Sequence, residues 1–74
     1  MQDETIGTVV VWNHPEGWGV LRSPDLADDV WVHFSDVETI DGQGLNVGNR
    51  VRFRYRAARQ DGWTLRATWV HRLP

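Results

Sequence analysis

The chain has 74 residues, 41% of them hydrophobic and 24% charged, a composition typical of a small globular domain and unlike that of disordered or collagen-like chains. It contains no cysteine, which excludes disulfide bridges and cysteine-ligated zinc, so its five Trp, two Phe and one Tyr are expected to supply a compact core. The formal net charge of −2 argues against an indiscriminate polyanion binder, because phosphate affinity comes from Lys and Arg. We expect one domain over residues 1–74, with its folded core over about residues 6–71.

The first residues are acidic and weakly apolar. Residues 1–5 include two acids and no base, and the longest aliphatic run is Val9, Val10 and Val11. A secretory leader would be basic and would continue into a longer apolar segment. The sequence therefore predicts a cytoplasmic protein without a membrane span.

Three β-strands are predicted in the first half of the chain, over residues 8–12, 18–22 and 30–34. The first is rich in β-branched side chains and stops at a turn that contains Pro15 and Gly17. A segment with one proline and three aspartates separates the second strand from the third, and its composition predicts a solvated turn.

The second and third strands each have an aliphatic face and an aromatic face. In the second strand, the side opposite Leu21 carries Trp18, Val20 and Arg22. In the third, Val30 and Val32 alternate with Trp31 and His33. The aliphatic faces are expected in the core, which leaves two indoles outside at a loss of about 2 kcal/mol of burial each. Exposed indoles suit single-stranded nucleic acid, because any base can stack on one for about 1–3 kcal/mol.

The second half is predicted to contain a long connection followed by a β-hairpin. The connection spans residues 35–49, includes three glycines and opens with a short helical turn. Strands over residues 50–57 and 63–71 flank Asp61 and Gly62, which tolerate the positive φ angles of a tight turn. Five short strands without an amphipathic helix indicate an all-β, five-stranded antiparallel barrel.

Charge is divided unequally along the chain. Residues 1–41 hold nine acids and one arginine, whereas residues 42–74 hold seven arginines and one aspartate. Four of these arginines alternate along one face of a predicted strand and are called here the arginine stripe: Arg50, Arg52, Arg54 and Arg56. Such a stripe is either a solvated face paired with acids across the barrel or a surface that follows phosphates.

Two aromatic motifs lie on the second and third predicted strands: Gly-Trp-Gly-Val-Leu at residues 17–21 and Asp-Val-Trp-Val-His-Phe-Ser at residues 29–35. Weaker motifs occur around them, at residues 7–9, at Asn13, and at residues 45–48, 51–53 and 67–70. In order and spacing they resemble the cold-shock domain family, which has Gly-Phe-Gly-Phe-Ile and Asp-Val-Phe-Val-His-Phe-Ser at the two main places. The resemblance covers nearly the whole chain and implies an OB-fold barrel that binds single-stranded RNA or DNA.

The resemblance also implies roles for individual residues. Four positions match aromatic residues that stack on bases in the family: Trp18, Trp31, His33 and Phe34. Trp12 matches a neighbouring aromatic residue, and Asn13 and Arg66 match polar contact positions. Strand alternation alone would bury Phe34 beside Val32, so a bend at the end of that strand is expected to bring Phe34 to the surface.

Three residues depart from the family pattern in ways that weaken binding. Val11 and Val20 replace aromatic residues that stack, and Glu16 replaces a lysine that approaches phosphate. Each lost stack would lower the binding free energy by about 1–3 kcal/mol. Trp63 follows the tight turn near the binding groove of this fold, so it is a candidate replacement platform.

Other aromatic and histidine residues favour structural roles. Trp12 and Trp69 are expected to pack in the core or at the end of the barrel, because large aromatic side chains dominate small cores. His14 and His71 are expected to be solvated. No metal site, cofactor or enzymatic activity is expected, because the sequence offers no ligand spacing, nucleophile elbow or paired acid and base.

These observations predict a monomer that binds single-stranded RNA or DNA with little sequence preference, as an RNA chaperone or a modulator of transcription or translation. The alternative is a small barrel whose exposed tryptophans bind a proline-rich or cationic peptide, which the acidic first half of the chain favours. Titration with an oligonucleotide separates the two, because stacking on bases quenches tryptophan fluorescence.

Overall fold

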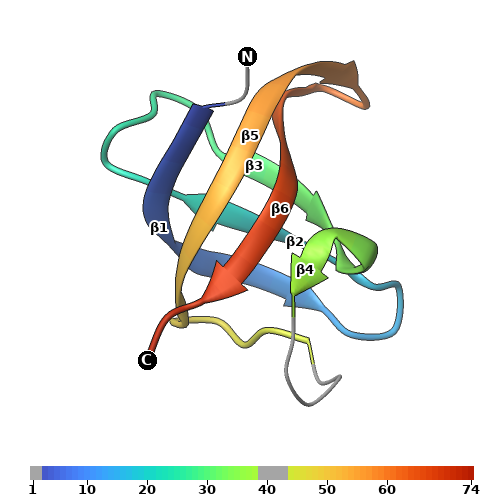
Figure 1. Cartoon of the computed structure of the whole chain (residues 1–74). Helices are drawn as coiled ribbons and strands as arrows, with labels where there is room; N and C mark the ends of the chain where they lie inside the picture. The colour runs from blue at the N-terminus through green and yellow to red at the C-terminus, as the bar shows by residue number, and fades with distance from the viewer. Residues whose placement is uncertain (1–2, 39–43) are drawn as a thin grey trace.

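The computed structural model describes residues 3–38 and 44–74, and nearly all of its regular structure is β-strand (Figure 1). The strands are β1 Asp3–Asn13, β2 Trp18–Arg22, β3 Val30–His33, β4 Val37–Glu38, β5 Arg50–Gln60 and β6 Trp63–Arg72. A three-residue 3₁₀ helix, η1, covers Phe34–Asp36 between β3 and β4. Within the described ranges there is no helix long and apolar enough to cross a membrane.

The sheet closes on itself into a barrel. Its hydrogen-bonded order is β3-β2-β1-β5-β6-β4, and β3 also pairs with β6, where Trp31 lies opposite Arg66. Closure removes the exposed strand edges that would otherwise invite pairing with other chains. The five-stranded barrel is thus confirmed, with two differences in detail: the closing β3–β6 pair is parallel, and the two-residue β4 adds a short parallel partner to β6.

Strand β1 is longer than predicted. It begins at Asp3 rather than at residue 8, because its first half, up to Thr8, pairs with β5. From Thr8 onward its partner is β2, and an irregularity between Val9 and Val11 marks the change of partner. The polar start of β1 therefore owes its strand conformation to β5, a distant part of the chain.

The core is mostly aliphatic, with Phe53 as its largest side chain. Fully buried side chains from all five long strands and from the segment before β5 form it: Val9, Leu21, Val30, Val32, Leu45, Val51, Phe53, Ala67 and Val70. The inward positions predicted for Leu21, Val30 and Val32 are confirmed. Of the aromatic residues expected to supply the core, Phe53 is fully buried, Trp12 and Tyr55 pack against the buried cluster, and all five tryptophans are only partly buried. A small barrel has an interior just wide enough for medium-sized side chains, so the indoles surround it.

Val20 also differs from its predicted environment. Alternation along β2 places it on the outer face with Trp18, yet it is only 4% exposed. It pairs directly with Trp31 on β3, and side chains that face each other across two strands contact one another. The larger indole therefore shields the valine from solvent.

The β5–β6 hairpin turns at Asp61 and Gly62, as predicted. Their φ angles are 51° and 85°. Positive φ at both central residues is what a type I′ turn requires, and this turn type matches the twist of the two strands. The turn places Trp63 at the start of β6.

Candidate nucleic-acid interface

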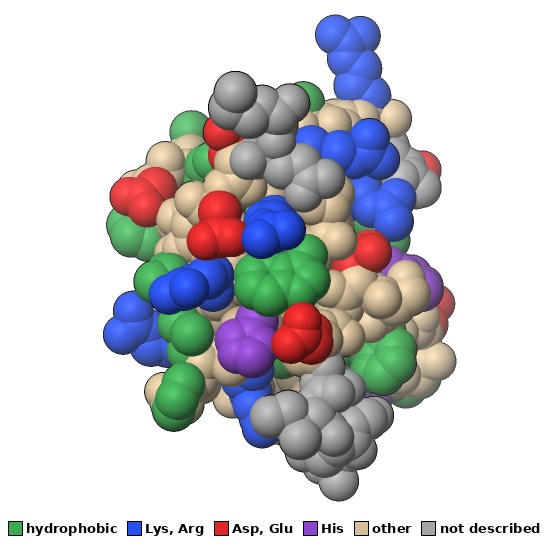
Figure 2. Space-filling view, in the orientation of Figure 1, with side chains coloured by type: hydrophobic (Ala, Val, Ile, Leu, Met, Phe, Trp, Pro, Cys, Tyr) green, Lys and Arg blue, Asp and Glu red, His purple; other side chains and the backbone are tan. Residues whose placement is uncertain are grey.

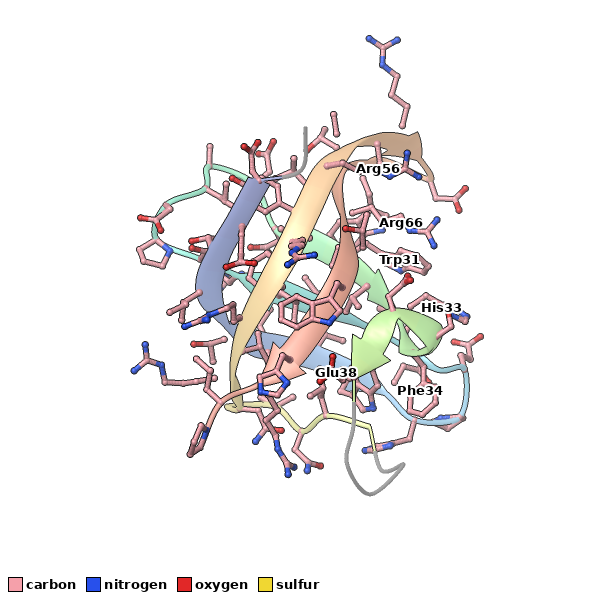
Figure 3. All side chains as sticks on the ribbon, in the orientation of Figure 1. Trp31, His33, Phe34, Glu38, Arg56 and Arg66 are labelled. Atoms are coloured by element: carbon pink, nitrogen blue, oxygen red, sulfur yellow. The ribbon has the colours of Figure 1, made fainter. Side chains whose placement is uncertain are left out.

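Three of the predicted stacking residues lie on neighbouring strands β2 and β3. In the antiparallel register Trp18 is opposite His33, and Trp31 is opposite Val20. Both indoles are half-buried and His33 is exposed, so the indoles offer partial rather than fully open faces. The rings of Trp31 and His33 are 6.0 Å apart between centroids. Figure 3 shows Trp31, His33 and Phe34 following one another along one edge of the barrel.

Phe34 reaches the surface through the predicted bend. Strand β3 ends at His33, η1 begins at Phe34, and the Phe34 side chain is 39% exposed. His33 caps η1, because its Nδ1 accepts a hydrogen bond from the Ser35 N–H at 3.2 Å. A neutral imidazole that accepts at Nδ1 has its proton on Nε2, so the Nε2–H group is the one that can donate a hydrogen bond to a ligand.

A pocket of about 570 Å³ opens beside this bend. Rings dominate its lining: Trp12, His14, Pro15, His33 and Phe34. The centroid of the Trp12 ring is 6.2 Å from that of His14 and 6.4 Å from that of Phe34. Sequence reasoning missed His14 and Pro15 as lining residues; the available signal was their place in the β1–β2 turn, directly after Asn13.

Trp12 joins this pocket to the core. Its indole packs against the buried cluster, as predicted, and also forms part of the pocket wall. The ring is wedged between two glycines: a Cβ at Gly19 would lie 2.3 Å from Trp12 Cε3, and a Cβ at Gly44 would lie 2.8 Å from Trp12 Cζ2. Only glycine leaves room for the indole at these two positions.

The β1–β2 turn is held together by Glu16. Its N–H donates to Asn13 Oδ1 at 3.0 Å, and its Oε2 accepts hydrogen bonds from Asn13 Nδ2 at 2.8 Å and from Trp18 Nε1 at 3.2 Å. Asn13, predicted as a ligand contact, is therefore already engaged within the turn. Glu16 replaces the positive charge expected there with a negative one, and it also fixes the edge of the Trp18 indole.

A second, smaller pocket lies between Trp31 and Trp63. Arg66 also lines it, with its guanidinium over the Trp31 ring at 5.3 Å from the centroid and its Nη2 3.4 Å from Asp36 Oδ2. A cation over an indole face is attracted by the ring quadrupole. The structure thus brings the candidates Trp63 and Arg66 together with Trp31.

Arg22, on β2, is neutralised by a neighbour. Its Nε and Nη2 each donate to an Asp29 carboxylate oxygen at 3.0 Å. This bidentate pair raises the pKa of Arg22 above its ordinary value and lowers the pKa of Asp29. The turn predicted to be solvated has Asp25 and Asp28 exposed, and both carboxylates also accept hydrogen bonds from threonines of β1 and β6. In the described part of the chain, no three His, Asp or Glu side chains gather into a group that could hold a metal ion.

Within the described ranges, one arginine of the stripe has an ion pair and three have none. Arg54 Nε is 3.1 Å from Glu4 Oε1, and the Arg54 guanidinium lies 5.1 Å from the centroid of the Trp69 ring. The other three members of the stripe are exposed and have no ion pair with any residue of the described ranges: Arg50, Arg52 and Arg56. Figure 2 shows several basic side chains distributed over the face formed by β5 and β6. The predicted pairing with acids across the barrel is therefore found at Arg54 alone among the described contacts.

Trp69, expected in the core or at the end of the barrel, is only partly buried and packs on the outside of β6 rather than against the core. It stacks on His71 with 5.9 Å between centroids and 3° between planes, and its Nε1 donates to Glu38 Oε2 at 2.9 Å. Glu38 Oε1 is also 3.4 Å from His71 Nδ1, so His71 has neighbours rather than solvent alone. Ala67 and Val70 are both fully buried, with two residues between them instead of one. Buried and exposed side chains therefore do not simply alternate along β6.

The comparisons with known proteins agree with this geometry. The family model of the 'Cold-shock' DNA-binding domain matches residues 5–71. The cold shock-like protein CspE of Escherichia coli K12 is 38% identical over 47 residues, which cover 64% of this chain and 68% of CspE, and CspE of Shigella flexneri gives the same values. The solved structure drosophila Unr CSD456 superposes with a TM-score of 0.73 at 22% identity, covering 97% of this chain and 27% of that one. This chain thus spans about a quarter of that longer chain, and the likeness concerns the fold.

Proposed function

Because the chain belongs to the cold-shock DNA-binding domain family, whose members generally bind nucleic acids, we propose that it binds single-stranded RNA or DNA by stacking. The observation that carries the proposal is a set of accessible aromatic rings on β2, β3 and η1: Trp18, Trp31, His33 and Phe34. Bases of a single strand can be splayed out and stacked on such rings, which a duplex does not permit. Every base has a π-face, so we expect little sequence preference.

Stacking on these rings supplies enough free energy for measurable binding. Each stacked base contributes about 1–3 kcal/mol, so three stacks contribute roughly 3–9 kcal/mol. A Kd of 1 µM corresponds to about 8 kcal/mol, near the upper end of this range, so we expect a Kd in the micromolar range or weaker. Trp63, beside Trp31, offers a further platform in place of the aromatic residues that Val11 and Val20 replace.

The proposed role is that of an RNA chaperone, or a modulator of transcription or translation, acting as a monomer in the cytoplasm. Sequence-tolerant stacking of micromolar strength holds a strand open and releases it quickly, which suits this role. The proposed activity is binding without catalysis, and it requires neither a metal nor a cofactor.

A titration with labelled oligothymidine tests the proposal. Its anisotropy should rise as protein is added at low salt, tryptophan fluorescence should be quenched, and both changes should reverse as salt rises. W18A and W31A should each weaken binding roughly five- to 150-fold, and the double variant should weaken it further. W69A is the matched control, because Trp69 lies on the outside of β6, in contact with Glu38 and His71.

The proposal fails if the wild-type protein leaves the anisotropy unchanged at high micromolar concentrations. It fails equally if W69A weakens binding as much as W18A and W31A. Quenching by a proline-rich peptide in place of the oligonucleotide would favour the peptide-binding alternative.

A further inference from the structure

The outer surface that carries Trp31 continues across β6 to the arginine stripe on β5. Trp31 pairs with Arg66 where β3 meets β6, and Arg66 pairs with Arg56 where β6 meets β5. Neighbouring strands are about 4.8 Å apart, so the backbones of Trp31 and Arg56 are roughly 10 Å apart, across two strand spacings. Figure 3 shows Arg56, Arg66 and Trp31 in one row along the same edge of the barrel, with His33 and Phe34 following.

An irregularity in the β5–β6 ladder divides the stripe at this point. Between Arg54 and Tyr55 the register shifts, so Arg54 pairs with Trp69 whereas Arg56 pairs with Arg66. Such irregularities turn side chains toward new neighbours. Arg54 contacts Glu4 and Trp69. Arg56 instead lies opposite Arg66, whose guanidinium covers the Trp31 ring.

Arg56 and Arg66 face each other with like charge, and neighbouring carboxylates balance them only in part. Like charges directly opposite each other across two strands destabilise the pair. Arg66 has a contact of 3.4 Å with Asp36, whereas Arg56 is exposed and has no ion pair with the described residues. An anion between the two guanidinium groups would relieve the repulsion, and guanidinium pairs with phosphate oxygens in a planar, bidentate way.

We propose that Arg56 and Arg66 hold a phosphate of the same strand whose base stacks on Trp31, so that the bound strand leaves the aromatic face over β6 toward β5. This inference rests on the proposed function. Phosphate is favoured over a carboxylate-bearing protein partner because the two cations adjoin a base-stacking ring, and a nucleotide offers a base and a phosphate together. Arg56 thereby extends the binding surface onto β5.

The test compares R56Q with R52Q, a matched control on the same strand and the same face. Arg52 is also exposed and without an ion pair to the described residues, but it pairs with His71 rather than with Arg66. The measurement is the affinity for oligothymidine over a range of salt concentrations. Removing one phosphate contact should reduce the slope of log K against log salt by about 0.7 for a single strand. We expect that reduction for R56Q and a wild-type slope for R52Q.

The possible outcomes separate this inference from the proposed function. If the wild-type protein binds oligothymidine and R56Q keeps the wild-type slope, the inference is overturned and the proposed function stands. Equal reductions for R56Q and R52Q also overturn it, because they would reflect the general charge of the face rather than one contact. A wild-type protein that binds no oligothymidine overturns both.

Discussion

The packing of Trp12 between Gly19 and Gly44 makes a strong prediction for the variant Gly44→Ala. The added Cβ would lie 2.8 Å, 2.9 Å and 3.0 Å from three atoms of the Trp12 indole. Carbon atoms in favourable contact are about 3.5–4.0 Å apart, so the ring would have to move by roughly 0.5–1 Å. The ring cannot easily move away, because on its other side it packs against the backbone of Gly19. Its Cε3 is only 2.3 Å from where a Cβ on Gly19 would stand.

The expected loss of stability follows from two opposing effects. Overpacking costs about 1–3 kcal/mol, whereas replacing a glycine by alanine restricts the unfolded chain and returns about 0.4–1 kcal/mol. We therefore expect Gly44→Ala to lower the free energy of unfolding by about 1–2 kcal/mol. For a domain of this size that corresponds to a fall in Tm of roughly 4–16 °C.

Thermal unfolding followed by far-UV circular dichroism measures this effect, and a double-mutant cycle assigns its cause. In a Trp12→Leu background the clash is removed, so Gly44→Ala should be neutral or slightly stabilising. An unchanged Tm in the wild-type background, or the same loss in both backgrounds, would refute the proposed wedge.

Three other predictions concern the charges and platforms of the candidate interface. Trp63→Ala should weaken oligothymidine binding roughly five- to 150-fold in an anisotropy titration, whereas unchanged affinity would remove Trp63 as a platform. Glu16→Gln keeps an acceptor for Trp18 Nε1 but removes a negative charge. Oligothymidine binding should therefore tighten up to about threefold at low salt, and the gain should fade at high salt. An equal gain at all salt concentrations would contradict an electrostatic cause. Asp29→Asn should be less stable than the wild type at pH 7, because the lowered pKa of Asp29 means that its pair with Arg22 stabilises the fold above the ordinary pKa near 3.8. The difference in Tm between Asp29→Asn and wild type should disappear as the pH falls through the lowered pKa, and a difference that persists there would exclude the pair as its cause.

Local patterns in the sequence predict much of this barrel. Alternation in β3 identifies Val30 and Val32 as buried, and the Asp61-Gly62 dipeptide identifies the β5–β6 turn. Both features depend on a few neighbouring residues: the first on the two faces of a strand, the second on residues that tolerate positive φ. Such features are predicted correctly because the tertiary structure favours the same conformation as the local sequence.

Features that depend on distant partners could not be predicted in this way. The start of β1 at Asp3 requires β5, and β4 exists because Val37 pairs with Val70 on β6. The burial of Val20 depends on the large side chain of Trp31 on the next strand. In each case the deciding neighbour is far away in sequence or on another strand.

Alternation and the family resemblance predicted where the residues of the candidate interface lie in the fold, but not how they contact one another. The sequence identified Trp31 and His33 by alternation, and the bend that exposes Phe34 followed from the conflict between alternation and the family resemblance. The hydrogen bonds of Glu16 to Asn13 and Trp18 have no periodic signal, because they depend on the conformation of a turn.

If bases stack on the indoles of β2 and β3, the indole N–H resonances will report it for each tryptophan. A two-dimensional NMR titration with oligothymidine observes each tryptophan Nε1–H separately. We predict that the signals of Trp18 and Trp31 shift progressively, while the signal of Trp69, which lies on the outside of β6 against His71 and Glu38, stays in place. Stationary signals for Trp18 and Trp31, with a shift confined to Trp69, would contradict stacking on β2 and β3.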